Sequence, residues 1–515
     1  MRGFIATSAL ALALLVPAAT ATGSAGRVQF RPGGIVPHLS AGRADAYPPS
    51  KAVGYAPPTT LTFDAGYETL INQYFADVAS DSTGTANVYS VATQYYDNPG
   101  TVHVQYQSTV GGSYVSRDPL PRNGCNDGFD TYCLTDQQLQ QEIQAVLTSQ
   151  GWHGGLDHIF FLMTPNGVGS CGDSTSTECS TNKFCAYHSY FIDSGNEDVI
   201  YANEPYEGPY PGCTDPAQGF PNDVDSDTTI NTISHEHNEA ITDPLTDPTS
   251  YAWITANLKY ENGDLCAYGF GTPIGGTPGL DAYNQVINTH NYELQEEWSN
   301  ADNGCVQRPG GSVSPATSGS GPLAYHGGPV MHTNTTYAIY WLPTSGNTGA
   351  PAITGTAAVN QVLTSSTGSW NGAPTSFSYQ WQRCLPGGTS CANIPGATGS
   401  TYTLTSADGG NVVRSTVSAT NVNGASAYAA SAISSAVIPL PAATAPPVIS
   451  GVAAAGKSLS VSTGTWNTPA TFTYQWLSCN AKGTGCAAVA GATDNSYFLL
   501  GEDAGHTLQV VVTAT

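Results

Sequence analysis

The segment TISHEHNEAITDP, residues 232–244, carries side chains that bind metals, and it carries them at helical spacing. His235 and Glu239 are four residues apart, so in a helix they share one face and can ligate one cation. Glu236 follows the histidine and can take a proton from a metal-bound water, as the glutamate of H-E-x-x-H does. We therefore expect His235 and Glu239 to be metal ligands and Glu236 to be the general base.

Two other interpretations of this segment remain open from the residues alone. By chance, H-E-x-x-E is expected in on the order of one in a hundred such chains, but a five-residue motif could still belong to the solvated face of a surface helix. His237 falls in the same helical sector as Ile233 and Ile241. It is therefore predicted to be a buried, hydrogen-bonded histidine rather than a ligand.

A third ligand is expected from YENGDLCAYG, residues 260–269. This stretch offers Asp264, which we favour, and Glu261 as the alternative, beside a cysteine that could anchor the loop. One imidazole with carboxylate oxygens suits Zn²⁺, while the hard oxygen ligands leave Mn²⁺ and Ca²⁺ as competitors.

Other candidates are weaker. NDVDSD alternates Asp223, Asp225 and Asp227 as a calcium loop begins, but the glycine and glutamate that such a loop needs later are missing. Asp227 is instead predicted to cap the helix. No G-x-S-x-G occurs, so a serine nucleophile elbow has no support. The remaining candidates are predicted to be structural, although one could help bind substrate: His153, His158, His188, His290 and Glu297.

The elements that must position the motif lie between residues 59 and 309. Helical spacing is found over 64–80 and again over 134–151, where Thr135 and Gln138 form a capping pattern and Gly151 ends the helix. Strand patterns cover 87–96, 102–108, 157–165, 185–192 and 198–203. This mixture predicts an α/β or α+β domain in which the last helix carries the metal motif.

Three segments in this order support a family resemblance: SHEHNEAITDP, ENGDLCAYG and YNQVINTHNYELQEEWSNADNGC. They resemble the EXORDIUM-like, phosphate-induced secreted family and its bacterial relatives over about residues 59–309. For plant members the resemblance implies an extracellular role in growth and wall-related signalling without a firmly attached enzymatic activity. For bacterial members it implies an α+β zincin-like fold, with a mixed sheet and an active-site helix, and a peptidase.

One segment departs from that family pattern. YHGGPVMHTNTTYAIYWLP, residues 325–343, resembles the part that normally leads the domain, yet here it follows the domain and a predicted linker at 310–323. We expect residues 324–349 to fold back and complete the sheet, because an unpaired strand would expose apolar surface. The alternative is that they begin a second, incomplete copy.

The rest of the chain contains an internal repeat. TGSWNGAPTSFSYQWQRC, ending at Cys384, recurs as TGTWNTPATFTYQWLSC, ending at Cys479. The two copies, 350–438 and 448–515 with a linker at 439–447, are predicted to be all-β sandwiches. They resemble the Ig-like repeats of secreted actinobacterial proteins, with Trp381 and Trp476 in the cores. The second copy stops before its last expected strand, which predicts a truncation.

The composition indicates the compartment of the protein and excludes some classes of partner. Residues 1–21 have the pattern of a signal peptide, and 22–58 read as an irregular leader or propeptide. Twelve cysteines fit an oxidising environment, with Cys125–Cys133, Cys171–Cys179 and Cys266–Cys305 as candidate pairs. A net charge of -24 argues against nucleic acid and anionic membranes, and no later apolar run is long enough for a membrane span. The sequence leaves the oligomeric state open.

Together these patterns predict a secreted zinc metallopeptidase, acting on a peptide or protein, with Ig-like modules that attach it to a surface or polymer. The alternative is a non-catalytic, EXORDIUM-like protein that binds cell wall or matrix and holds a structural metal. A third interpretation makes the tail an adhesin and the first domain a carrier.

Overall fold

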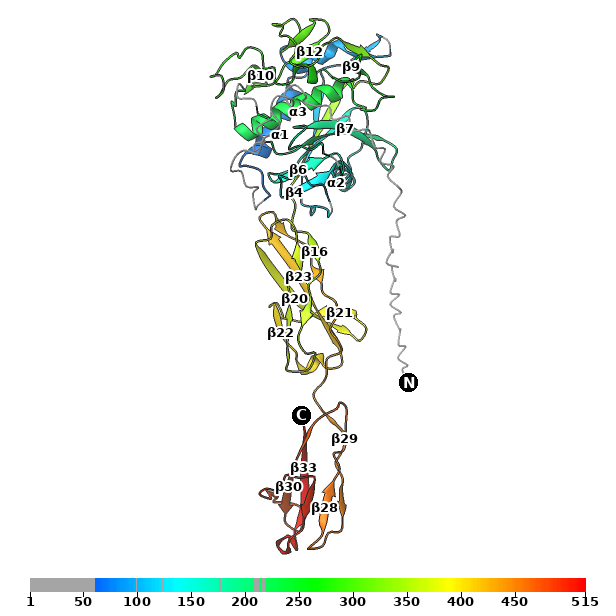
Figure 1. Ribbon diagram of the computed structural model, residues 1–515, viewed down its shortest axis with the longest axis vertical. Helices are drawn as coiled ribbons and strands as arrows, with labels where there is room; N and C mark the ends of the chain where they lie inside the picture. Colours follow the sequence, from blue (N-terminus) through cyan, green and yellow to red (C-terminus); the bar gives the residue numbers. More distant parts are fainter. Residues whose placement is uncertain (1–60, 99, 123, 176, 208–212, 215–217) are drawn as a thin grey trace, which may run out of the picture. The chain divides into compact units, whose positions relative to one another are not determined.

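The computed structural model describes residues 61–98, 100–122, 124–175, 177–207, 213–214 and 218–515. The predicted signal peptide and leader lie outside these residues. The chain divides into two compact units (Figure 1). Among the described residues, those in the ranges 63–115 and 124–340 belong to the first unit, and those in the ranges 61–62, 116–122 and 341–515 form the second.

The first unit is built on a five-stranded sheet. Its order is β3 (Ser108–Ser116), β15 (Asn334–Trp341), β5 (His158–Met163), β8 (Asp198–Glu204) and β7 (Tyr187–Ile192). β15, β5 and β8 run parallel, whereas β7 is antiparallel to β8. The sheet is therefore mixed, and the predicted strands at 157–165, 185–192 and 198–203 are all present in it.

The strand that follows the predicted linker lies inside this sheet. Thr335 of β15 is in register with His158 of β5, and β15 separates β5 from β3. Residues 310–323 are not a free linker, because Ser314 exchanges two backbone hydrogen bonds with Cys305 and Thr317 N–H donates to the Leu265 carbonyl at 2.9 Å. Residues 342–349, which follow β15, belong to the second unit, where β16 (Asn347–Gly349) pairs with β19 (Ser369–Trp370).

Helices cover both faces of the sheet. Successive side chains of a strand point to opposite faces. In β8, Ala202 therefore joins the core with α1 (Tyr67–Ser80) and α3 (Val224–Thr242), whereas the Tyr201 hydroxyl bonds to Gln140 and Asp136 of α2 (Asp136–Gln150). Figure 1 labels α3 beside α1. α2 has the predicted capping box at Thr135 and ends at Gly151, whose φ is 68°.

Helix α3 lies in the interior of the unit. Every residue from Ser226 to Thr242 is buried. Its N-cap is Asp223, whose side chain accepts from the N–H groups of Asp225 and Ser226. The prediction that Asp227 caps the helix is wrong: its carboxylate lies in the first turn and accepts from the Asn222 amide at 2.7 Å. A carboxylate at either position stabilises the helix, because its negative charge lies at the positive end of the helix dipole.

Two strand predictions are wrong. In the range 102–108, only Val102–His103 and Ser108 belong to strands. Residues 87–96 form a 3₁₀ helix, η1 (Val88–Gln94), followed by a short strand, β1 (Tyr96–Asp97), which pairs with β2 (Val102–His103). Val88 to Ala92 are all buried. Their side chains meet protein on every side, as when the Tyr89 hydroxyl contacts that of Tyr74 at 2.8 Å. A short apolar run of this kind does not distinguish strand from helix by its period.

Short two-stranded sheets complete the first unit. The same unit also has a short 3₁₀ helix, η2 (Asp264–Cys266). The pairs are β4 (Tyr132–Thr135) with β6 (Val168–Cys171), β9 (Trp253–Thr255) with β14 (Leu323–Tyr325), β10 (Gln285–Ile287) with β11 (His290–Tyr292), and β12 (Glu297–Ser299) with β13 (Gly304–Val306).

The second unit contains the two repeats as all-β modules. Each has two small sheets around a tryptophan that is fully buried, Trp381 in the first and Trp476 in the second. The first module has β17 (Ile353–Thr354), β18 (Val362–Ser365) and β22 (Thr401–Thr403) in one sheet, and β20 (Ser376–Leu385), β21 (Thr389–Asn393), β23 (Val412–Asn421), β24 (Gly424–Ala425) and β25 (Ala429–Ala430) in the other.

The second module repeats this pairing. β27 (Ile449–Gly451), β28 (Ser458–Val461) and β32 (Ser496–Phe498) form one sheet, and β30 (Phe472–Cys479), β31 (Ala487–Ala488) and β33 (Thr507–Ala514) form the other. β26 (Ala443–Ala445) pairs with β29 (Thr465–Trp466), so part of the predicted linker at 439–447 belongs to this module.

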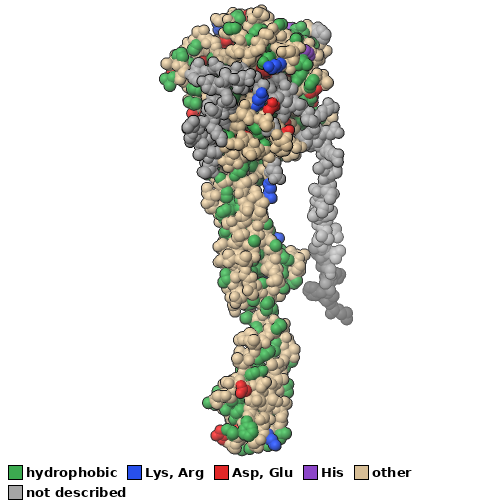
Figure 2. Space-filling view, in the orientation of Figure 1, with side chains coloured by type: hydrophobic (Ala, Val, Ile, Leu, Met, Phe, Trp, Pro, Cys, Tyr) green, Lys and Arg blue, Asp and Glu red, His purple; other side chains and the backbone are tan. Residues whose placement is uncertain are grey.

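Six disulfides join all twelve cysteines. The three candidate pairs, Cys125–Cys133, Cys171–Cys179 and Cys266–Cys305, are confirmed. The others are Cys185–Cys213, Cys384–Cys391 and Cys479–Cys486. This number of disulfides fits an extracellular, oxidising environment. Within the described part of the chain, no helix has the length and apolarity to cross a bilayer. On the face shown in Figure 2, charged side chains are sparse and form no extended patch of one sign.

Candidate metal centre

The motif side chains are buried. Only 4% of His235, 2% of Glu236 and none of Glu239 is exposed. Isolated carboxylates in such a place are costly unless they are hydrogen-bonded, protonated or bound to a cation. The interpretation of these groups as a solvated helix face is therefore wrong.

The first ligand group consists of His235, Glu239 and Asp264. His235 Nε2 lies 3.0 Å from Glu239 Oε1 and 4.0 Å from Asp264 Oδ1. One ligand atom from each of the three residues lies within 4.8 Å of the others. Ligand atoms that share one cation at about 2 Å lie roughly 3 to 4 Å apart. The set fits a divalent metal that accepts one nitrogen and two oxygen ligands.

The loop that carries Asp264 is fixed against α3. Asp264 N–H donates to Glu239 Oε1 at 2.9 Å, and the Thr242 hydroxyl donates to Asn262 Oδ1 at 3.1 Å. Cys266, two residues further on, is joined to Cys305 of β13. The short helix η2 thus begins with its acidic residue beside the motif, although the two segments are 25 residues apart in sequence.

A second group lies on the other side of Glu239. His188 Nδ1 is 3.3 Å from Glu236 Oε2 and 3.7 Å from Glu239 Oε2. His188, Glu236 and Glu239 also offer ligand atoms within 4.8 Å of one another. Glu261 lies on this side, with Oε1 3.8 Å from His188 Nε2. The two acidic residues that the sequence offered as third ligand therefore approach different histidines: Asp264 approaches His235, and Glu261 approaches His188.

The surrounding carboxylates shift the pKa of both histidines. Burial by itself would lower the pKa of His235, but Glu239, Glu236 and Asp264 outweigh it and raise that pKa well above its usual value. The pKa of His188 is also raised, because Glu236 and Glu239 outweigh the effect of burial. Both imidazoles therefore lie in a strongly negative potential, which favours a cation.

His188 was not among the ligands expected from sequence. It belongs to β7, where Tyr187 points to the face covered by α2 and its hydroxyl donates to Asp136 at 2.7 Å. His188, the next residue, points to the opposite face, toward α3. Strand alternation could have indicated its face, but only the sheet order brings β7 beside the motif.

The other histidines that the sequence offered are not in either group. His237 is buried against Tyr89 and Asn334, with ring nitrogens 3.1 and 2.9 Å from their side-chain oxygens. Burial lowers its pKa to about 4, so it is neutral at physiological pH. His158 contacts the carbonyl of His153, and His290 pairs with Asp77 at 2.8 Å.

Three further carboxylates near the motif were not expected from the sequence to be ligands. Glu204, Glu207 and Glu297 are fully buried, and burial raises the pKa of each well above its usual value. The Thr232 hydroxyl, one turn before Glu236, lies 2.9 Å from Glu204 and 2.8 Å from Glu207. The raised pKa values favour the neutral, protonated form of these carboxyl groups.

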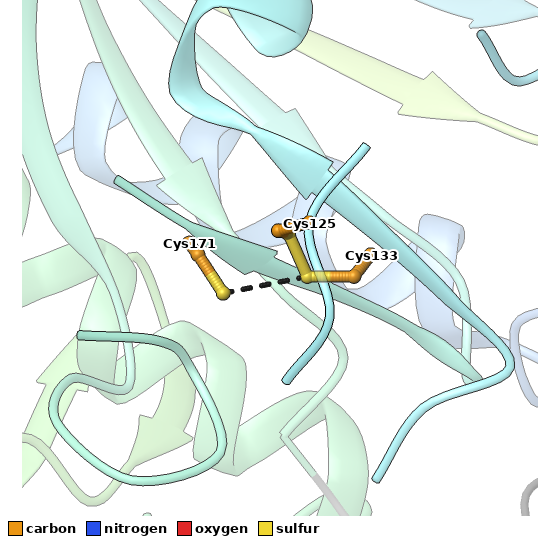
Figure 3. Close-up of side chains that lie close together, drawn as sticks. All are labelled: Cys125, Cys133 and Cys171. Carbon is orange, nitrogen blue, oxygen red and sulfur yellow. Dashed lines mark hydrogen bonds between the residues drawn. A yellow bond between two sulfur atoms is a disulfide. The ribbon is translucent and has the colours of Figure 1, made fainter. Parts of the chain in front are cut away.

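A cluster of three cysteines elsewhere offers no metal site. Cys133 Sγ lies 3.4 Å from Cys171 Sγ, as Figure 3 shows. All three belong to disulfides, Cys125 with Cys133 and Cys171 with Cys179. A disulfide sulfur is not a thiolate, the form that ligates metals.

Comparison with known proteins finds similarity only at the level of solved structures. No protein-family model and no curated protein matches the chain. Among solved structures, the chicken interferon gamma receptor alpha chain is similar at 8% identity and a TM-score of 0.15, over 32% of this chain and 83% of that one. The FN1–FN3 domains of chicken CNTN1 are similar at 17% identity and a TM-score of 0.16, over 32% and 60%. The description of the tail therefore rests on its own strand pairing.

Proposed function

We propose that this protein is a secreted, metal-dependent hydrolase, and most simply a zinc metallopeptidase with a zincin-like first domain. The observation that carries the proposal is the arrangement of His235, Glu239 and Asp264 around one point, with the Glu236 carboxylate 4.0 Å from His235 Nε2. When bound, a divalent cation supplies Lewis-acid activation of water and of a substrate carbonyl.

The chain's own residues would supply the general base and the group that positions it. Glu236 accepts the proton of the attacking water, because its carboxylate lies on the same helix as the ligands and beside them. His188 contacts Glu236 Oε2 at 3.3 Å and orients it. His188 also lies 3.1 Å from the Asp243 carbonyl, so its ring has a fixed orientation.

Two features support a zincin-like arrangement. The motif helix packs against β5, β8 and β7 of a mixed sheet, and the antiparallel edge strand β7 lies on the motif side. The second feature is that the third ligand, Asp264, comes from a loop that follows the helix in sequence. The resemblance to EXORDIUM-like proteins and their bacterial relatives adds to this, and the Ig-like modules would hold the enzyme at an extracellular surface or polymer.

A second candidate function has one observation in its favour. The ligand atoms are almost closed to solvent: the side chains of His235, Glu239 and Asp264 are 5%, 0% and 1% exposed. Structural metal sites are closed, whereas catalytic ones keep an open position. This favours a non-catalytic, EXORDIUM-like protein that binds cell wall or matrix and uses the metal for stability.

The substitution Glu236→Gln distinguishes the two functions. The full chain and the variant are loaded with Zn²⁺, and metal content and cleavage of a broad peptide library are measured on the same samples. We expect the wild type to cleave and the variant to lose at least 100-fold in rate, roughly the usual size of general-base catalysis, while the cation of the His235 group stays bound. Glu142→Gln, a buried glutamate of α2 on the other side of the sheet, should leave both measurements unchanged.

Each other result has a definite meaning. A wild type that holds zinc and cleaves no peptide supports the binding protein and rejects the hydrolase. A wild type that holds no divalent metal rejects both functions.

A further inference from the structure

The two ligand groups share one residue, and each uses a different atom of it. Glu239 Oε1 lies 3.0 Å from His235 Nε2 on one side, and Oε2 lies 3.7 Å from His188 Nδ1 on the other. A carboxylate with its two oxygens directed to two ligand groups is the arrangement of a bridging ligand in a two-metal centre. We propose that a second divalent cation binds beside the first, held by His188 Nδ1, Glu236 Oε2 and Glu239 Oε2.

The second site rests on the proposed cation at His235, Glu239 and Asp264, since the bridge needs both ions. It gives a ligand role to His188, which the sequence alone predicted to be structural. The two ions of such centres lie about 3.5 to 4 Å apart, a separation that one bridging carboxylate spans.

The orientation of His188 suits a ligand. Its Nε2 lies 3.1 Å from the Asp243 backbone carbonyl, an acceptor only, so Nε2 carries the hydrogen. Nδ1 is then the nitrogen that faces Glu236 and Glu239. Metal-binding histidines commonly donate their other N–H to a backbone carbonyl in this way, which fixes the tautomer and directs the lone pair at the ion.

The cluster is strongly acidic. Glu236, Glu239, Glu261 and Asp264 are all buried and carry four negative charges when ionised, and the neighbouring Asp243 is fully buried as well. Buried net charge is unfavourable, and two divalent cations offset more of this negative charge than one does.

Two further buried carboxylates lie close enough to Glu236 for its charge to act on them. Glu204 and Glu207 are fully buried, and each leaves one oxygen, Oε1 and Oε2 respectively, without a hydrogen bond among the described residues. Hydrogen bonds between the described residues therefore do not satisfy all the polar atoms of this part of the interior.

Glu236 can be both the general base and a ligand of the second cation, because its two carboxylate oxygens approach different histidines. Oε2 faces His188 at 3.3 Å, whereas Oε1 lies 4.0 Å from His235 Nε2. A monodentate ligand through Oε2 leaves Oε1 on the side of the first ion. The second cation would then also hold the base in place.

Metal stoichiometry tests the second site. The full chain is stripped with a chelator, dialysed against Mn²⁺, and its manganese is counted by mass spectrometry. We expect two ions per chain for the wild type and one for His188→Gln. His158→Gln is the matched control, because His158 is also a strand histidine bonded to a backbone carbonyl, and it should keep two ions.

A measurement on the wild type covers the case in which His188→Gln does not fold. Electron paramagnetic resonance of the Mn²⁺-loaded wild type should show an exchange-coupled pair, since the ions share Glu239, rather than the six-line signal of isolated ions.

The failures of the two proposals are distinguishable. One ion in both the wild type and His188→Gln overturns the second site and leaves the first standing. Two ions in both overturns the placement at His188. A wild type with no bound Mn²⁺ and no bound Zn²⁺ overturns this site together with the proposed function.

Discussion

At the scale of single residues, Gly263 is the one that lets the loop approach the motif. A β-carbon there would lie 2.9 Å from Glu239 Oε1 and 3.0 Å from His235 Nδ1, closer than such atoms normally come. Its φ and ψ, -65° and -45°, are ordinary for any residue. Glycine is therefore needed at this position for space rather than for backbone freedom.

Gly263→Ala should weaken the metal centre without unfolding the domain. The added methyl group displaces His235 or Glu239, so we expect metal affinity to fall about 10- to 100-fold, the usual effect of disturbing a ligand's support. Competition titration with a chelating dye measures the change. Gly501→Ala, where nothing lies within 4 Å of the new β-carbon, is the control and should bind as the wild type does. Equal affinity for both variants would contradict the placement of the loop.

At the scale of elements, the segment with Asp264 depends on a covalent support. Cys266 of η2 is joined to Cys305 of β13 across 39 residues. Leu265 and Cys266 are fully buried, and the Leu265 carbonyl accepts from Thr317 N–H. The disulfide and these contacts hold the first residue of η2 against α3.

Removal of this disulfide should affect both stability and metal binding. We expect the double substitution Cys266→Ser with Cys305→Ser to cost about 2 to 5 kcal/mol of unfolding free energy and to lower metal affinity. Denaturant unfolding and metal titration measure the two effects. The matched control is Cys125→Ser with Cys133→Ser, which removes a disulfide beside β4, away from the motif. The control should lose stability only, and a similar loss of metal affinity in both would contradict the proposed support.

At the scale of the whole molecule, the last module has its own core. Leu459, Val461, Trp476 and Leu499 pack together, and the partly buried residues around them all lie between Ile449 and Val512. A module whose core uses no residue from the rest of the chain can be removed without leaving a cavity elsewhere.

Deletion of residues 442–515 should therefore leave the metal centre unchanged. We expect the shortened chain to bind the same number of metal ions with the same affinity, and its first thermal transition to stay at the temperature seen in the full chain. Calorimetry and metal titration check this. A loss of bound metal on deletion would show that the last module supports the first unit.

The local features of this protein follow from short stretches of its sequence. The helical spacing of His235 and Glu239, the capping box at Thr135, the strand patterns of β5, β7 and β8, and the repeat with its two tryptophans are all set by neighbours in the chain. Three of the six disulfides also followed from short or plausible loops. Local patterns are sufficient for these features because turns, caps and periodicity depend on residues a few positions apart.

Which distant residues meet depends on the tertiary structure. It brought His188 to the motif because β7 is the edge strand next to β8, and it placed the Glu261 carboxylate nearer His188 and the Asp264 carboxylate nearer His235. It also turned residues 88–94 into a 3₁₀ helix, because protein surrounds that run on every side. These outcomes depend on strand order and on packing across the sheet, and one sequence alone carries no direct record of either.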